Sequence, residues 1–110
     1  MKTVPERPVA PLRIKCSIFS NGSNGWGVRV LGGLKVRLEH FDRSASPVWI
    51  EVDGADVDFN VDKRTFWNGG CGELIRKPVE AWAKTRNLKT GDHVWLVVLE
   101  PKKRFRLTDL

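Results

Sequence analysis

TFWNGGCGELIRKPVEAWAKTRNLKTGDHVWLVVLEPKKRFRL, residues 65–107, is the segment that decides the fold class of this chain. Its patterns predict, in order, the end of a strand, a glycine-rich bend, one short amphipathic helix, a Gly-Asp turn and a closing β-hairpin. The remaining segments have β patterns, so one helix is inserted into an otherwise β-patterned chain. This order of elements is typical of a small β-barrel.

The helix in this segment is predicted to begin near Pro78, because a proline in the first helical turn loses no intrahelical hydrogen bond. Val79, Trp82 and Ala83 follow at the spacing of one helical face and form an apolar stripe. The preceding residues 73–75 are compatible with a further helical turn. We therefore expect one helix here, with its apolar stripe in the core.

The closing hairpin is predicted from Thr90-Gly91-Asp92, where the glycine supplies the bend and the aspartate accepts hydrogen bonds from backbone amides. Residues 93–99, HVWLVVL, are almost continuously apolar and are expected to form a buried central strand. A turn at residues 101–103 leads into an alternating final strand at residues 104–107.

The first two thirds of the chain alternate apolar and polar residues at period two, as half-buried strands do. In residues 34–39 the apolar side chains are expected on one face of a strand, with Lys35 and Arg37 on the other. Asp53-Gly54 is a strong hairpin signal, and no helix is expected in this part. The predicted strands are residues 13–19, 26–31, 34–39, 48–52 and 57–61.

Length and composition fit one folded domain. The 110 residues, 41% of them hydrophobic, are enough to bury a core. Residues 1–11 contain three prolines and are expected to be a flexible lead-in, which leaves residues 12–110 as the domain. We predict a mainly β fold with one or two short helices, namely an open β-barrel (pseudobarrel) of about seven strands.

The charge of the chain favours a polyanionic partner. There are 19 Lys and Arg against 13 Asp and Glu, which gives a formal net charge of +6. Such a balance suits nucleic acid. No apolar run approaches the length of a membrane span, and the first residues lack the apolar core of a signal peptide. We therefore expect a cytoplasmic protein with no membrane partner.

Metal and cofactor chemistry has little support in the sequence. Cys16 and Cys71 are expected to stay reduced, because no secretion signal is recognised. His40 and His93 are the two histidines, and no CxxC or HxxxH spacing occurs, which argues against a structural zinc site. We predict no metal site and no cofactor.

The order of elements resembles the DNA-binding pseudobarrel of the B-three type, found in plant transcription factors and in recognition domains of some restriction endonucleases. Members of that family are open seven-stranded barrels with two short helices. The segments that carry the resemblance, which covers mainly residues 65–107, are Leu88-Lys89-Thr90-Gly91-Asp92 and then Val94-Trp95-Leu96-Val97-Val98. Phe66-Trp67, Cys71, Glu73-Leu74 and Trp82 also resemble segments of uncharacterised bacterial proteins with a similar ending.

The resemblance implies that two arms grip the major groove and the phosphates of duplex DNA. The first arm corresponds to residues 20–26, where Gly22, Gly25 and Gly27 would let the backbone approach the DNA. The second corresponds to residues 62–68. A plain hairpin turn and a connecting loop explain the same residues without any ligand. The DNA-binding residues implied for the two arms and their flanks are Lys15, Asn21, Ser23, Asn24, Trp26, Arg29, Lys63, Arg64, Trp67 and Asn68.

Two further basic groups extend the predicted DNA surface. Arg29, Lys35 and Arg37 alternate on predicted strands and form either a phosphate track or the solvent face of ordinary strands. The turn after residue 100 carries the densest positive cluster, which either contacts phosphates or protects a sheet edge from pairing. The residues added by these groups are Lys35, Arg37, Lys102, Lys103 and Arg104.

The tryptophans divide into two groups. Trp49, Trp82 and Trp95 lie in apolar patterns and are expected in the core. Trp26 and Trp67 flank glycine-rich turns, which makes them the better candidates for stacking on bases.

No motif supports an enzyme. Asp53, Asp56, Asp58 and Asp62 are clustered but lack the spacing of a nuclease site, and Cys71 has no histidine obviously placed to activate it. We predict no catalytic residue and a non-enzymatic nucleic-acid-binding domain, with duplex DNA as the favoured ligand. Two alternatives stay open: a protein-protein interaction or assembly module whose basic surface meets an acidic partner, and an RNA-binding barrel.

Overall fold

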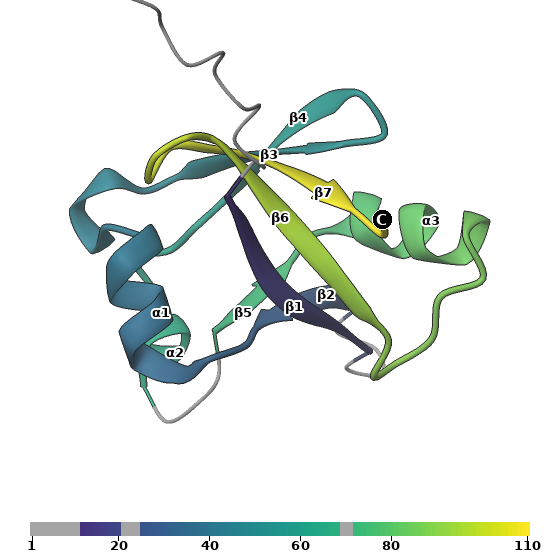
Figure 1. The fold of residues 1–110 in the computed structure, drawn as a ribbon, viewed down its shortest axis with the longest axis horizontal. Coiled ribbons are helices and arrows are strands. Elements are labelled where there is room, and N and C mark those ends of the chain that lie inside the picture. Colours follow the sequence, from purple (N-terminus) through teal and green to yellow (C-terminus); the bar gives the residue numbers. More distant parts are fainter. Residues whose placement is uncertain (1–11, 21–24, 69–71) are drawn as a thin grey trace, which may run out of the picture.

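The computed structural model describes residues 12–20, 25–68 and 72–110. Seven strands in these residues form one mixed sheet that curls into a nearly closed barrel (Figure 1). This confirms the prediction of an open β-barrel of about seven strands. The strands are β1 (Arg13–Ser20), β2 (Trp26–Val30), β3 (Val48–Val52), β4 (Ala55–Phe59), β5 (Glu73–Ile75), β6 (His93–Glu100) and β7 (Arg104–Thr108).

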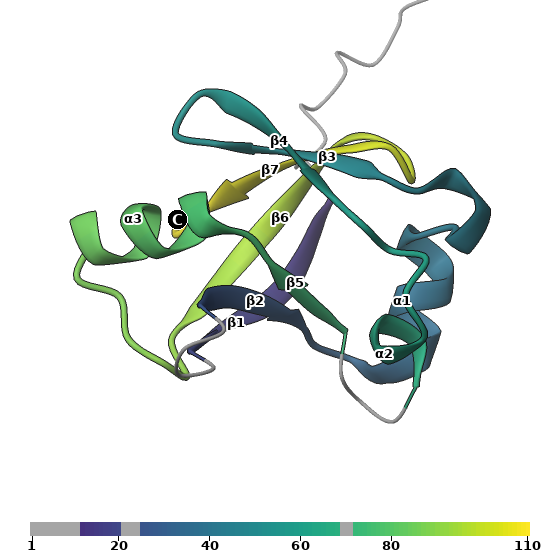
Figure 2. The same ribbon diagram turned by 180° about the vertical axis from the view of Figure 1, so that it is seen from behind.

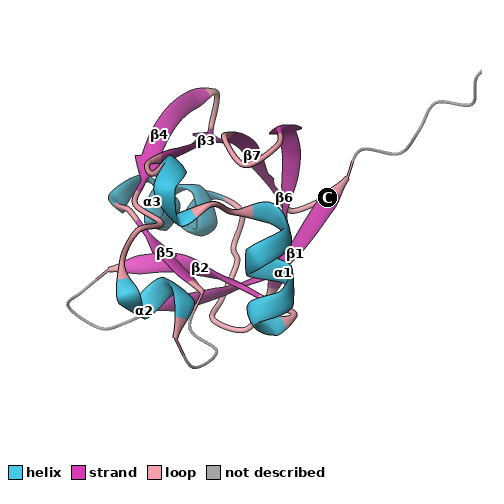
Figure 3. Ribbon diagram, turned by 90° about the vertical axis from the view of Figure 1, so that its left-hand side faces the viewer, coloured by secondary structure: helices cyan, strands magenta, loops and turns pink. Residues whose placement is uncertain are grey.

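The strands follow the order β4-β3-β7-β6-β1-β2-β5 around the barrel. Neighbouring strands are antiparallel, except for β3 and β7, which are parallel. β4 and β5 are the two edges, and they lie on the same side of the barrel in Figure 3. Arg76, just after β5, spans this open seam, where its Nη1 donates to the backbone oxygen of Asp58 at 2.9 Å and to Oδ1 of the same residue at 3.0 Å.

Helices cover the two ends of the barrel. α1 (Gly33–His40) packs against β2, α2 (Arg64–Trp67) against β5, and α3 (Lys77–Thr85) against β2 and β3. α1 and α2 lie at one end and α3 at the other (Figures 1 and 2). A short 3-10 turn, η2 (Arg43–Ala45), follows α1.

The core is built from the inward residues of the strands and the apolar face of α3. The expected stripe of Val79, Trp82 and Ala83 is buried, and Pro78 stands in the first turn of α3 as predicted. Below α1 and α2, the Phe41 ring packs edge-on against the Phe66 ring, with 5.2 Å between centroids. The core therefore reaches from α3 to the opposite end.

Turn predictions are confirmed at one hairpin and at the connection from α3 to β6. Asp53-Gly54 connects β3 to β4. Before β6, the Lys89 amide donates to Oδ2 of Asp92 at 2.7 Å, as the Gly-Asp turn requires.

The prediction of a strand at residues 34–39 is wrong, because these residues form α1. Leu, Lys, Arg and Glu have high helix propensity, and that preference decides here over a two-residue alternation. Gly32 allows the entry into the helix. Its φ is +98°, and a Cβ there would lie 2.4 Å from Cγ2 of Val36, so a larger residue would be strained.

Four smaller expectations are also corrected. Residues 73–75 form β5 rather than a helical turn, and the second predicted arm contains α2. β6 is buried on one face only, where Val94 and Leu96 point inward. Trp49, expected in the core, is 44% exposed on the outer face of β3.

The proposed lead-in, residues 1–11, lies outside the described residues. Among the residues that the structure describes, no helix has the length and apolar character needed to cross a membrane.

Candidate nucleic-acid interface

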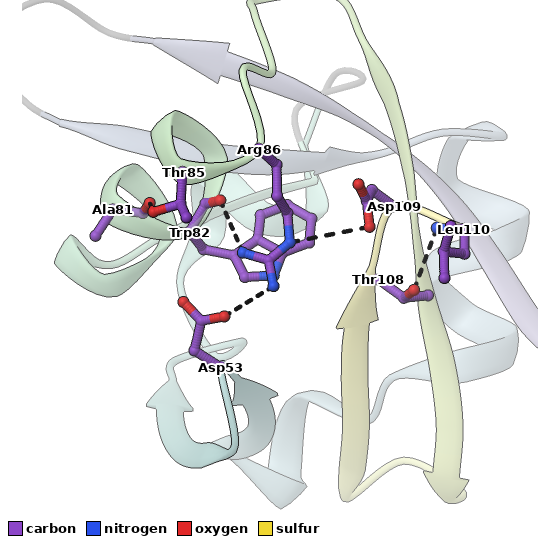
Figure 4. A network of polar contacts seen from close by, with 8 residues as sticks. All are labelled: Asp53, Ala81, Trp82, Thr85, Arg86, Thr108, Asp109 and Leu110. Atoms are coloured by element: carbon purple, nitrogen blue, oxygen red, sulfur yellow. Dashed lines mark hydrogen bonds and ion pairs between the residues drawn. The ribbon is translucent and has the colours of Figure 1, made fainter.

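At the α3 end of the barrel, the principal cations are held by carboxylates. Arg86 is the centre of this arrangement (Figure 4). Its Nη2 donates to Oδ1 of Asp53 at 2.9 Å, its Nη1 donates to the Trp82 carbonyl at 3.0 Å, and Asp109 lies 3.9 Å from its Nε. One guanidinium thus joins α3, the β3–β4 turn and the segment after β7.

At the opposite end, five cations have no ion-pair partner among the described residues. They are carried by α1, η2, the start of α2 and the β6–β7 turn, which lie together at the same end of the barrel (Figure 1). All five side chains belong to exposed residues, so they are available to an anionic ligand. We call this group the basic end, and its members are Lys35, Arg43, Lys63, Arg64 and Lys102.

Three acidic residues share these elements but offset the charge only in part. Asp42 caps η2, and its Oδ1 accepts from Oγ of Ser44 at 2.7 Å and from the Ser44 amide at 2.9 Å. These hydrogen bonds, with a smaller contribution from Lys102, lower the pKa of Asp42. Glu39 lies 3.6 Å from His40, and Asp62 is exposed. The basic end keeps a positive excess.

Arg37 is not part of this surface. Its residue is 2% exposed, and its Nη1 donates to the Phe66 carbonyl at 2.7 Å, so it ties α1 to the end of α2. Its place in the predicted phosphate track is therefore wrong. Arg29 is also engaged, because its Nη2 donates to Oε2 of Glu73 at 2.8 Å. Of that predicted track, only Lys35 remains an exposed cation without an ion pair among the described residues.

A groove with a volume of about 520 Å³ opens between α1, α2 and the β6–β7 turn. Phe41 and Trp67, both buried, lie at its base, while Leu34 and Leu38 are 47% and 58% exposed. We call it the α1–α2 groove. Its lining residues are Leu34, Leu38, Phe41, Asp42, Arg43, Trp67, Asn68 and Lys102.

The structure brings together most of the second predicted arm. Lys63 and Arg64 belong to the basic end, and Asn68 lines the same groove as Lys102. Trp67, however, is 9% exposed and donates from Nε1 to the Val61 carbonyl at 2.6 Å. It is a core residue, and the prediction that it stacks on bases is wrong.

The first predicted arm is described only at its base. Asn21, Ser23 and Asn24 lie outside the described residues. Lys15 is exposed on β1, where its backbone oxygen accepts from the Leu31 amide at 3.0 Å. Trp26 is partly buried, with Nζ of Lys84 5.7 Å from its ring centroid. The described parts of the two arms therefore do not form one continuous surface.

Gly27 has a structural role in place of the predicted approach to DNA. A Cβ at this position would lie 2.4 Å from the Leu74 carbonyl oxygen and 3.0 Å from the Phe19 ring. Glycine is needed here because β5 and Phe19 pack closely over this part of β2.

The positive cluster after residue 100 is mostly paired. Arg104 donates to Asp56 at 3.1 Å, and Nζ of Lys103 lies 3.8 Å from Glu100. Of the three predicted residues, only Lys102 lacks an ion pair among the described residues. The cluster thus contributes one side chain to the basic end.

The aspartates that suggested a nuclease are used in ion pairs. Asp53 contacts Arg86, Asp56 contacts Arg104, and Asp58 contacts Arg76. No group of three or more His, Cys, Asp or Glu residues that could hold a metal ion occurs in residues 12–20, 25–68 and 72–110. Cys71 lies outside these ranges.

Sequence reasoning missed three residues of this end. Arg43 was not singled out from the sequence, and nothing in its neighbourhood marks it as functional. Leu34 and Leu38 were assigned to a buried strand face. Their spacing of four residues is also that of one helical face, and it was the signal that could have revealed an exposed apolar pair.

No protein-family model, curated protein sequence or solved structure matches this chain.

Proposed function

We propose that this chain is a non-enzymatic DNA-binding β-barrel whose basic end contacts the phosphates of duplex DNA. The observation that carries the proposal is the distribution of ion pairs. Carboxylates hold Arg76 and Arg86 at the α3 end, whereas the five cations of the basic end have no ion-pair partner among the described residues. Two lysines beside α3, Lys77 and Lys89, also lack an ion pair among those residues, so the unpaired charge is larger at the basic end rather than confined to it. Exposed Lys and Arg side chains without carboxylate partners gain most from contacting a polyanion.

The architecture supports the same proposal. The B-three-type pseudobarrel combines an open seven-stranded barrel with two short helices. The described residues of this chain form seven strands in an open barrel, with α1 in the first half, α3 in the second and the four-residue α2 in addition. We propose membership of that type on these grounds. Because barrels of this size serve many functions, the cation distribution carries more weight than the fold.

The main test is a fluorescence anisotropy titration of labelled duplex DNA over a series of salt concentrations. Each phosphate contact makes the slope of log K against log salt more negative by about 0.9. If all five cations of the basic end contact phosphates, the slope should approach −4 to −5, within about one unit. Absence of salt-dependent binding at low ionic strength would exclude the proposed function.

A charge-matched pair of variants locates the interface. Replacing Lys63 and Arg64 by alanine should reduce the magnitude of the slope by about 2. Replacing Lys77 and Lys89, which are exposed cations on either side of α3, removes the same charge and should leave the slope unchanged. An equal decrease of the slope in the two variants would show that DNA binding depends on net charge alone and not on the position of the cations.

The RNA alternative is tested in the same format. Single-stranded RNA added as an unlabelled competitor should displace the duplex DNA less well than the same duplex does. If single-stranded RNA displaces the labelled duplex more strongly than unlabelled duplex does, the ligand is RNA rather than DNA.

A further inference from the structure

The α1–α2 groove contains an exposed apolar pair that the fold does not use. Leu34 and Leu38 are successive turns apart on α1, and they remain 47% and 58% exposed beside the buried rings of Phe41 and Trp67. Single exposed leucines are common on proteins. Two that line one groove of about 520 Å³ form the kind of surface that binds another molecule.

The rim of the groove is cationic. Arg43 and Lys102 line it directly, and Lys35 belongs to the same helix as the two leucines. The Asp42 carboxylate also lines the groove, and its Oδ1 accepts two hydrogen bonds from Ser44. Arg43 and Lys102 together exceed this one negative charge. The groove therefore combines apolar walls with a basic rim.

This chemistry selects among possible occupants. A second copy of the chain would place the five cations of one basic end against those of the other. The chain's own residues 1–11 carry Lys2 and Arg7 against Glu6, and their three prolines disfavour an amphipathic helix. A DNA backbone would satisfy the cations but would leave the leucines without an apolar partner.

We propose that the α1–α2 groove docks a short amphipathic segment of a partner protein, with apolar side chains seated on Leu34 and Leu38 and Asp or Glu residues facing Arg43 and Lys102. Apolar contact gives such a complex its affinity, and the opposite charges select the acidic partner. The docking does not rest on the proposed DNA binding, but Arg43 and Lys102 belong to both surfaces, so the docked segment and duplex DNA would compete for these two side chains.

A random peptide display library, panned against the full chain, tests the docking proposal. The enriched peptides should combine apolar residues with Asp or Glu. Their binding, measured by anisotropy with the labelled enriched peptides, should weaken at least about tenfold in the Leu34→Gln/Leu38→Gln variant, since burial of two leucines is lost. Glutamine is chosen because its helix propensity is close to that of leucine.

The matched control is Leu12→Gln/Leu99→Gln, which changes two exposed leucines outside the groove and should bind the peptides like the parent. Arg43→Glu/Lys102→Glu should weaken binding by about tenfold or more, because the rim charge is reversed. Circular dichroism verifies that each variant is folded.

Several results would overturn the docking proposal. These are no enrichment above empty beads, enriched peptides without acidic residues, or equal binding by the groove variant and the parent. Concentration-dependent self-association in ultracentrifugation that disappears in Leu34→Gln/Leu38→Gln would assign the groove to a second copy. A loss of duplex DNA binding in Leu34→Gln/Leu38→Gln would assign the groove to the DNA interface. Unchanged duplex DNA binding would show that the two leucines serve only the peptide.

Discussion

The two ends of the barrel carry similar numbers of cations but differ in what those cations contact. At the α3 end, Arg76, Lys84 and Arg86 each lie within 3.0 Å of a carboxylate oxygen. At the basic end, the cations have no such partner among the described residues, and two leucines stay exposed beside them. Arg76 and Arg86 hold elements of the α3 end together, and two lysines there, Lys77 and Lys89, lack an ion pair in the part of the chain that the structure describes. All five cations of the basic end are left for a ligand.

The largest effect expected at the α3 end comes from its core. Trp82 is 1% exposed, so Trp82→Ala should lower the free energy of unfolding by about 3–5 kcal/mol through lost burial and a cavity. Urea denaturation followed by circular dichroism measures it. Trp49→Ala, at a tryptophan that is 44% exposed, is the control and should cost about 1 kcal/mol or less. Equal costs would contradict the assignment of Trp82 to the core.

Arg37 tests the comparison at the other end, because it is a buried arginine whose side chain the fold itself uses. Arg37→Ala should cost about 2 kcal/mol, since the Phe66 carbonyl loses a buried hydrogen bond and a cavity forms. Faster amide hydrogen exchange in residues 66–68 should accompany the loss. Lys35→Ala on the same helix should change stability by about 0.5 kcal/mol or less. A larger cost for Lys35 would show that the basic end stabilises the fold after all.

Features set by residues close together in the sequence could be predicted, whereas features set by contacts between distant residues could not. Pro78 and the Val79–Trp82–Ala83 stripe predicted α3 because caps and helical faces are local properties. The turns at Asp53-Gly54 and Thr90-Asp92 were predicted for the same reason. Local patterns also predicted a β-barrel of about seven strands, although the number agrees because the false strand at residues 34–39 compensates for the missed β5.

Most of the candidate site could not be predicted from local sequence patterns. Residues 34–38 alternate as a strand does, and over so short a length that alternation concealed the helix propensity that decides for α1. Arg29 and Arg37 look like any surface cation until Glu73 and the Phe66 carbonyl, both far along the chain, are seen beside them. Which cations remain unpaired is a property of the folded molecule, so the predicted DNA surface included several that the fold already uses.

A smaller effect is expected for Arg86, because its ion pairs are partly exposed. Arg86→Ala should cost about 1 kcal/mol, with part of that loss removed by high salt. A double-mutant cycle with Asp53→Ala isolates the direct pair and should give a coupling of about 0.5 kcal/mol. A coupling energy of zero between Arg86 and Asp53, with an unchanged free energy of unfolding in Arg86→Ala, would contradict a stabilising role of these ion pairs at the α3 end.

The smallest effect at neutral pH concerns Cys16, in the barrel between the two ends. Burial raises the pKa of its thiol from 9.0 to about 12. The folded state therefore keeps a proton that the unfolded state releases, so stability is full below pH 9 and falls as the pH rises towards 12. Urea denaturation of the parent should show a steeper loss over this range than Cys16→Val, which has no ionisable group. Parallel curves would contradict a buried thiol.

The contrast between the two ends is tested most directly by mapping backbone amide chemical shifts while the chain is titrated with duplex DNA at low salt. The predicted result is that the largest shift changes fall in α1, η2, α2 and the β6–β7 turn, with little change in α3 or the β3–β4 turn. Shift changes centred on α3, or on the outer face of β1 and β2, would contradict the assignment of ligand binding to the basic end.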